Sequence, residues 1–317
     1  MPATDLERWP ALPYAAWQDT RATLHLWTQV VGKVRLALTP WQNHSWHVAL
    51  YVTARGLTTG PIPHGAGGFQ IDFDFIDHRL LVRTGAGAER DVPLRPMTVA
   101  AFYAETMAAL AALGIAVRID TMPNEIPGAV PFDQDETHAA YDADYARRFW
   151  RALVSAHEVM ARFRTGFLGK SSPVHFFWGS FDLAVTRFSG RVAPKHPGGV
   201  PNLSDAVAQE AYSHEVSSAG FWPGSPGPVE YAAFYSYAYP GPEGFAAARV
   251  QPSEAFWSDA LGEFVLPYDA VRAARDPDAT LMAFLQSTYD AAADRAHWDR
   301  AALECAVGEP GVCRKAY

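Results

Sequence analysis

The sequence predicts an α+β fold in which antiparallel sheet is packed by long helices. Two long stretches, 14–38 and 141–166, carry apolar residues at helical spacing, and several shorter runs alternate as strands do. The order of helix, strands and helix occurs twice along the chain. Hydrophobic residues make up 49% and charged residues 19% of the 317 residues, which is a globular composition large enough to bury a substantial core.

The first half is predicted to begin with the helix at 14–38, which Pro40 ends. The strands expected after it are 46–54, 69–75 and 79–84. A helix over 98–113, ended by Gly114, and a short strand over 115–119 complete this half.

Residues 121–135 carry three prolines and three acidic residues, which is typical of a connection between two units. The second half is expected to contain a helix at 141–166, strands at 174–187, 212–221, 230–239 and 263–266, a surface loop at 191–203, and helices at 276–293 and 295–304. We therefore expect residues 1–120 and 136–317 to form two α+β halves of one compact body, joined by an ordered connection at 121–135.

Short similarities link the two halves. Gly32-Lys33 precedes "YVTARGLTTG" in the first half, and Gly169-Lys170 precedes "LAVTRFSG" in the second. Either the halves are duplicates related by a pseudo-twofold axis, or the similarities arose by chance. Since pockets often lie between halves, a duplication would favour a site at their interface.

The composition excludes several classes of protein. A net charge of −8 argues against nucleic-acid binding, and no apolar run is long enough to span a membrane. The N-terminus lacks the pattern of a signal peptide. The two cysteines, Cys305 and Cys313, cannot form a disulfide framework, so a reduced cytoplasmic protein is expected, with a disulfide between them left open.

Long motifs give the chain a family resemblance. "ATLHLWTQVVGK", "IDFDFIDHRL", "SPVHFFWGSFDLAVTRFSG" and "AYSHEVSSAGFWPG" resemble a bacterial family known only as a domain of unknown function. The resemblance covers roughly residues 9–304. It implies a shared architecture and no activity, cofactor or catalytic residue.

Three familiar motifs are incomplete. "GFLGKSS" has Arg164 where a P-loop needs its first glycine, and a helix is expected before it rather than a strand. "AHEVMA" and "SHEVSS" have Ala161 and Ser218 in place of the second histidine of a zinc-protease helix. The chain also lacks a G-x-S-x-G elbow and paired CxxC motifs.

The stretch "VHFFWGSFDLAVTRFSG" raises the first functional candidate, because it sets His175 among aromatic residues. His175 is either a buried core residue bonded to backbone or a metal ligand or general base in a dry pocket. If its strand pairs with the one at 212–221, His214 would approach His175, and both are the predicted catalytic residues.

Two histidines and a carboxylate suit a mononuclear iron or zinc site. Candidates for the other ligands are Glu215, Asp72, Asp74 and, from the first half, His44. Because thiolate ligands are lacking, iron oxidoreductase chemistry is favoured over zinc hydrolysis. His44 and His47 are also interpretable as ordinary loop histidines.

Asp182 is not expected in this site. A straight strand would place it more than ~20 Å from His175 and on the opposite face, unless a bulge at Gly179-Ser180 resets the register. We therefore predict an ion pair between Asp182 and Arg187 or Arg191.

The aromatic second half predicts a small-molecule pocket. Trp178 and Tyr212 are expected to contact the ligand, and Arg55 and Arg187 to hold an anionic group on it. The leading hypothesis is an enzyme acting on a small molecule. The alternative is a non-catalytic protein that binds a small molecule or a partner, with structural histidines.

Overall fold

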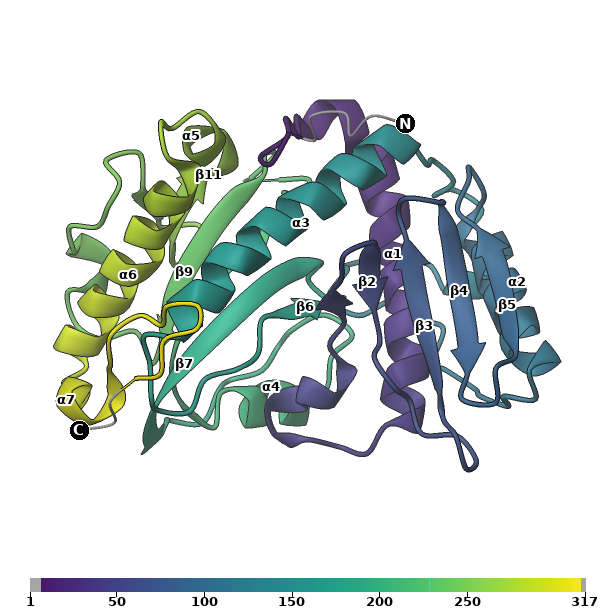
Figure 1. The fold of residues 1–317 in the computed structure, drawn as a ribbon, viewed down its shortest axis with the longest axis horizontal. Coiled ribbons are helices and arrows are strands. Elements are labelled where there is room, and N and C mark those ends of the chain that lie inside the picture. Colours follow the sequence, from purple (N-terminus) through teal and green to yellow (C-terminus); the bar gives the residue numbers. More distant parts are fainter. Residues whose placement is uncertain (1–6, 228, 315–317) are drawn as a thin grey trace.

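The computed structural model describes residues 7–227 and 229–314, and it confirms the α+β class (Figure 1). Two antiparallel sheets are each covered by helices. The first sheet has the order β1-β2-β3-β4-β5. Its strands are β1 (Tyr51–Val52), β2 (Gly56–Thr58), β3 (Phe69–Asp74), β4 (Arg79–Thr84) and β5 (Glu89–Pro93).

Two helices pack against this sheet. Helix α1 (Tyr14–Leu38) is amphipathic in its first turns and buried along most of its remaining length, and α2 (Val99–Ala112) begins at Thr98, whose side chain accepts a hydrogen bond from the Ala101 N–H. The Trp27 ring of α1 stacks on Phe102 of α2 at 4.6 Å, and Phe102 lies against Phe73 of β3. These rings join the helices to the sheet.

The second sheet has the order β10-β11-β9-β8-β7-β6. Its strands are β6 (His175–Phe177), β7 (Asp182–Val192), β8 (His214–Trp222), β9 (Ala233–Tyr239), β10 (Phe256–Ser258) and β11 (Glu263–Pro267). Helices α3 (Ala143–Arg164) and α6 (Pro277–Arg295) cross one face of it (Figure 1). The opposite face carries the cavity described below.

A backbone bridge joins the edges of the two sheets. The backbones of Leu50 and Phe176 exchange two hydrogen bonds of 2.8 Å, which link the segment before β1 to the edge strand β6. One hydrophobic core runs through both halves and includes Phe132 of the connecting segment, which is fully buried. Both sheets are therefore built on a shared interior.

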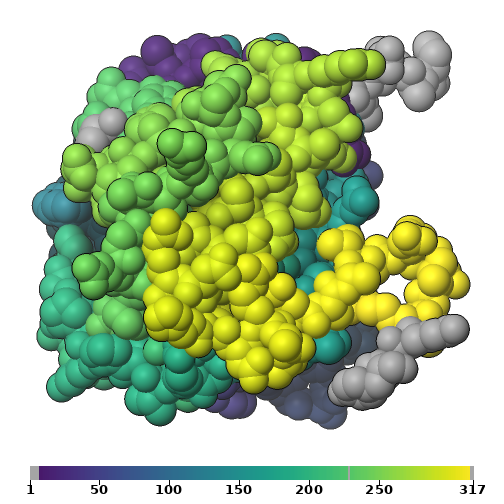
Figure 2. Space-filling view, turned by 90° about the vertical axis from the view of Figure 1, so that its left-hand side faces the viewer, coloured from purple at the N-terminus to yellow at the C-terminus, as the bar shows by residue number. Residues whose placement is uncertain are grey.

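Smaller elements complete the chain. They are the 3₁₀ helices η1 (Asn43–Val48), η2 (Phe132–Gln134) and η3 (Phe245–Ala247), and the short helices α4 (Asp205–Ala211), α5 (Tyr268–Arg272) and α7 (Arg300–Leu303). In Figure 2, α6 and the C-terminal residues (yellow) form one end of the molecule, together with the segment that follows β9 (green). No helix in the described ranges is long and apolar enough to cross a membrane.

Several predicted elements are wrong in detail. The strand expected at 46–54 is η1 followed by the two-residue strand β1, and residues 115–119 form no strand. The strand expected at 174–187 is a hairpin, because the chain turns at 178–181 between β6 and β7. The sequence pattern also missed β5, β10 and α4, and the helix expected at 295–304 is reduced to α7.

Candidate functional site

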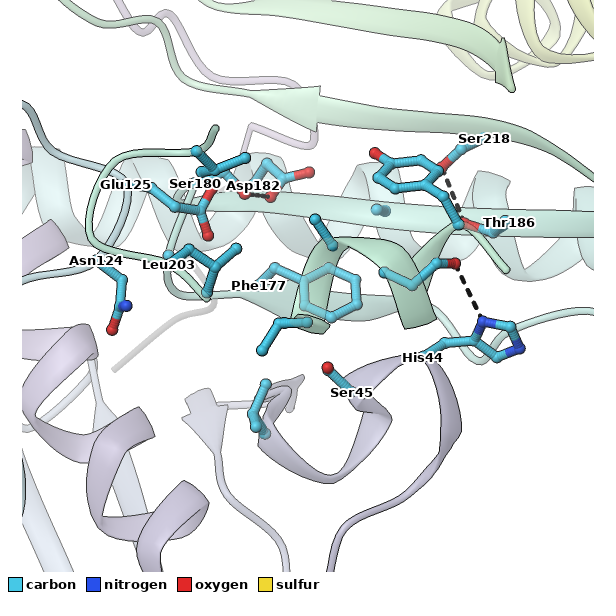
Figure 3. Close-up of a pocket in the computed structure, with 18 of the residues that line it drawn as sticks. His44, Ser45, Asn124, Glu125, Phe177, Ser180, Asp182, Thr186, Leu203 and Ser218 are labelled. Carbon is cyan, nitrogen blue, oxygen red and sulfur yellow. Dashed lines mark hydrogen bonds between the residues drawn. The ribbon is translucent and has the colours of Figure 1, made fainter. Parts of the chain in front are cut away.

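A cavity of about 710 Å³ lies on the face of the second sheet opposite α3 and α6 (Figure 3). The residues that form its floor occupy every second position along the strands, because successive side chains of a strand point to opposite faces of the sheet. The floor residues are Phe177, Asp182, Ala184, Thr186, Phe188, Val216, Ser218, Trp222, Ala233, Tyr235, Tyr237, Glu263 and Val265. The residues between them, such as Arg187 and Phe234, face α3, α6 or the core.

Three segments cover the floor. They are η1 with the residues leading into it (Trp41 to Val48), Asp120 with Asn124 and Glu125 of the connecting segment, and the stretch from Val200 to Tyr212 that contains α4. The cover is held by hydrogen bonds to backbone carbonyls: the Glu125 N–H donates to the Pro201 carbonyl at 2.8 Å, and the Gln29 side-chain amide donates to the carbonyl of Asn124. The cavity is thus formed by both halves and the connection between them.

The β6–β7 hairpin brings Asp182 into the cavity. Phe177 pairs directly with Asp182, so the two side chains share a face, and Phe181 in the turn adopts a φ of 60°. The prediction that Asp182 pairs with Arg187 or Arg191 is wrong, because Arg187 points to the other face of the same strand and Arg191 pairs with Glu215. The Asp182 carboxylate instead accepts hydrogen bonds from Ser180 Oγ, at 2.6 Å, and from the Tyr235 hydroxyl.

Burial raises the pKa of Asp182, while the two hydroxyl donors partly offset this effect. Asp182 is 6% exposed, and no cationic group neutralises it within the described residues. Its charged form therefore depends on the Ser180 and Tyr235 hydroxyls.

Glu125 occupies the same side of the cavity. Figure 3 shows Glu125, Ser180 and Asp182 grouped together, with His44 at the opposite side. The Glu125 carboxyl lies against Gly179, where a Cβ would come within 2.0 Å of its Oε1. Desolvation, followed by the charge of Asp182, raises the pKa of Glu125 to about 7.

Glu263 adds a third carboxyl from β11. Burial, followed by the charge of Asp182, raises its pKa to about 7 as well. In the described part of the chain, neither Glu125 nor Glu263 has a hydrogen bond or ion pair at its carboxyl group. Both carboxyl groups line the cavity and are available to contact a ligand bound there.

The tyrosines of β9 lie beside these acids. The Tyr235 and Tyr237 rings are stacked, with centroids 6.1 Å apart, and the Tyr237 hydroxyl is 2.9 Å from that of Tyr212. Desolvation raises the pKa of Tyr212 to about 12, so the phenol is neutral. Trp178 and Tyr212, which we predicted to contact a ligand, both line the cavity, and the Trp178 indole donates to the Val48 carbonyl.

The far side of the cavity contains His44. Its Nδ1 lies 3.1 Å from the Ala211 carbonyl, so that nitrogen carries the hydrogen, and its Nε2 accepts from Lys170 Nζ at 2.5 Å. Burial lowers the pKa of His44, with a smaller contribution in the same direction from Lys170. His44 and Ser45 have φ values of 58° and 57°, a strained conformation for residues other than glycine.

The strand order separates His175 from His214. β7 lies between their strands, with His175 opposite Ala184 and His214 opposite Val192. Eight residues of β7 correspond to roughly 25 Å along the strand. The prediction that both histidines bind one metal ion is therefore wrong, since we assumed that their strands are neighbours.

His175 is 1% exposed and lies among the rings of Trp46, Tyr51 and Phe177 outside the cavity lining. Desolvation lowers its pKa to about 3. His214 has its ring 6.1 Å from that of His44, so the structure brings together two of the predicted metal-ligand candidates.

The remaining predicted ligands lie elsewhere. Glu215 pairs with Arg191 at 2.7 Å, and Asp74 pairs with Arg55 at 2.6 Å. Asp72 pairs with Arg83 on the first sheet. The described residues contain no group of three or more His, Cys, Asp or Glu side chains that could hold a metal ion.

The predicted arginine clamp is also wrong. Arg55 lies on the first sheet and Arg187 points to the far face of the second, where it is caged by Phe163 and Tyr289. Arg187 lies between two cavity-lining positions of β7, Thr186 and Phe188. Its side chain therefore points to the opposite face of the sheet, toward α3. His47 lies against Trp41, and Cys305 and Cys313 are both free.

Sequence reasoning missed Glu125, Glu263, Tyr235 and Tyr237. The alternation in "AAFYSYAY" was enough to place the two tyrosines on one face of β9. The same period places Glu263 on the face shared with Val265. No local signal identifies Glu125, which lies in a proline-rich connection and reaches the cavity through tertiary folding.

A family model matches residues 9–305 of the chain. The chain belongs to this family of unknown function, DUF5996. The expected family resemblance is thus shown over nearly the full length. No significant similarity links the chain to a curated protein or to a solved structure.

Proposed function

We propose that this DUF5996 protein binds a small organic molecule in the cavity on the second sheet. One observation supports this proposal: three carboxyl side chains, of Glu125, Asp182 and Glu263, point into one cavity of about 710 Å³ with aromatic walls. Two of them, Glu125 and Glu263, have no partner among the described residues. Ligand pockets usually enclose ~300–1,000 Å³ and combine apolar walls with a few polar groups.

Acid–base catalysis on the bound molecule is a second candidate function. It is favoured by the different environments of Glu125 and Asp182: one carboxyl has no donor, whereas the other accepts two hydroxyl donors. Such a difference separates the proton affinities of two nearby acids. Glu125, with a pKa of about 7, is suited to exchange a proton near neutral pH.

The iron and zinc chemistry predicted from the sequence depended on His175 and His214 meeting at one ion. Because β7 lies between their strands, that pair does not support the present proposal. The proposal rests on the carboxyl-lined cavity alone.

The direct experiment is equilibrium dialysis of the full chain against a bacterial metabolite extract, with retained compounds identified by mass spectrometry. We expect one or a few small molecules to be enriched by the wild-type protein. Val207→Trp and Leu203→Trp fill the cavity from its cover rather than from the core, so each should fold and lose this enrichment.

The outcomes of this experiment test binding and separate it from catalysis. Enrichment that is absent in both cover variants supports binding in the cavity, and enrichment unchanged by both overturns it. A retained compound that is chemically altered by the wild type and left intact by Glu125→Gln supports acid–base catalysis. A compound that is recovered unaltered from the wild type restricts the function to binding.

A further inference from the structure

We propose that the cavity recognises an organic cation, whose charged group lies by Glu125, Asp182 and Glu263 and whose apolar part lies along the aromatic and aliphatic walls. This inference rests on the proposed function and specifies its ligand class. It goes beyond that function because a cavity of this size also suits neutral or anionic molecules.

The first argument is the charge of the lining. Four acidic residues line the cavity, and among the described lining residues none is a lysine or an arginine. Asp120 has its own cation, Lys33, at 3.6 Å. The other three carboxyls have none, so their charge is uncompensated within the described structure.

Burying uncompensated carboxylates is unfavourable, and a protein reduces the cost by binding protons or cations. In the absence of a ligand, protons serve this purpose, as the raised pKa values of Glu125 and Glu263 show. A cationic group placed between these side chains would replace the protons. An anionic ligand would add to the repulsion.

The second argument is the aromatic character of the walls beside the acids. Trp222, Tyr235 and Tyr237 line the floor near Asp182, and Phe177 pairs with it across the hairpin. The faces of such rings attract ammonium groups within ~6 Å of their centroids. Tyr235 is oriented by its hydrogen bond to Asp182, which fixes one ring beside the carboxyl.

The third argument is the polarity gradient of the cavity. The side opposite the acids is lined by Phe188, whose ring lies 4.7 Å from that of His44, and by its strand partner Val216. Burial, with a smaller contribution from Lys170, lowers the pKa of His44 on that side and so favours its neutral form. A ligand with one cationic end and an apolar body therefore matches both sides.

The test compares probes that differ in charge and share their shape. Choline and 3,3-dimethylbutan-1-ol form one such pair, and benzyltrimethylammonium and phenylacetate extend the comparison to a larger cation and an anion. Glucose represents neutral polyols, which also bind to aromatic and acidic sites. Affinity is measured by calorimetry on the full chain at pH 8, where Glu125 and Glu263 are mostly ionised.

We expect each cation to bind at least tenfold more tightly than its neutral or anionic counterpart at pH 8. Cation affinity should fall about tenfold at pH 6, because protons compete for the same carboxyls. Glu125→Gln and Glu263→Gln should each weaken cation binding severalfold. Glu243→Gln is the control, since it removes the same charge from an exposed residue outside the cavity.

Equal or tighter binding of the neutral probe, of glucose or of phenylacetate overturns the inference. So does the absence of binding by both cations at millimolar concentration. These failures are distinct from failure of the proposed function: retention of a neutral or anionic metabolite in the dialysis experiment would leave the binding function standing and reject the cation.

Discussion

The Tyr235 hydroxyl donates a hydrogen bond to the Asp182 carboxylate across the intervening strand β8. The residue between them on that strand is Gly220, which pairs with both Ala184 and Tyr235. A Cβ at Gly220 would lie 2.3 Å from the Tyr235 hydroxyl oxygen and 2.5 Å from the Leu183 carbonyl. The phenol reaches the carboxylate because this position has no side chain.

Gly220→Ala is therefore expected to displace Tyr235 and to destabilise the fold by about 1–3 kcal/mol, the usual cost of overpacking. The Leu183 carbonyl is part of β7 and cannot move aside. Urea denaturation measures the change. Gly241→Ala is the matched control, because the nearest atom to its added Cβ lies at 3.9 Å; equal stability of the two variants would contradict this explanation.

Tyr235→Phe keeps the ring and removes the donor. Asp182 then keeps the Ser180 hydroxyl as its side-chain donor within the described structure, so we expect the free energy of unfolding to fall by about 1–3 kcal/mol. The effect should be smaller at acid pH, where protonation of Asp182 removes the charge that the hydroxyl stabilises. Tyr231→Phe, at a partly exposed residue, serves as the control, and an equally small effect of both changes would argue against a role for this hydrogen bond.

The stability of the protein should fall as the pH rises toward 8. Glu125 and Glu263 have pKa values of about 7 in the folded state against an ordinary value near 4.5, so the folded state binds more protons between these limits. Their stabilising effect is complete below pH 4.5 and is lost as the pH rises through 7.

Glu125→Gln should therefore reduce this pH dependence and raise the stability at pH 8, by up to about 3 kcal/mol. Thermal unfolding at pH 5, 6, 7 and 8 provides the comparison with wild type. The exposed-site variant Glu243→Gln should follow the wild-type profile. Parallel profiles for wild type and Glu125→Gln would mean that Glu125 ionises normally.

We expect His175 to make the stability of the protein depend on pH below 6.5. Its pKa is lowered to about 3 by burial, against an ordinary value near 6.5, so its neutral form stabilises the fold above pH 6.5. This stabilisation is lost as the pH falls from 6.5 toward 3.

His175→Phe should fit among the surrounding rings and weaken the loss of stability between pH 6.5 and 4. Ligand binding should remain within twofold of wild type, because His175 lies outside the cavity lining. His64→Phe, at a partly exposed histidine, is the control. Loss of ligand binding in His175→Phe with an unchanged acid profile would restore the functional interpretation that the sequence suggested.

The sequence predicted the fold class because periodicity reports local structure. The helices at 14–38 and 141–166 and the alternating strand at 69–75 were found close to their observed bounds, since each buries one regular face. The hairpin at 178–181 was missed because residues 174–187 were interpreted as one straight strand, with a bulge at Gly179-Ser180 considered only as an exception. That one error placed Asp182 on the wrong face and far from its true neighbours.

The site was less predictable because it depends on strand order. His175 and His214 were chosen on the assumption that their strands pair, and periodicity carries no information on whether β7 separates them. Glu125 reaches the cavity from a connection 57 residues before Asp182, and only the folded chain brings them together. Trp178 and Tyr212 were identified because aromatic residues near a sheet often line cavities.

A crystallographic fragment screen tests most directly whether the cavity on the second sheet is a ligand site. Crystals of the full chain would be soaked with cationic, neutral and anionic fragments. We predict that bound fragments concentrate in the cavity, between the β7–β9 floor and the cover formed by η1 and α4. Fragments bound at other surfaces throughout such a screen, with the cavity unfilled by any of them, would contradict the proposed function.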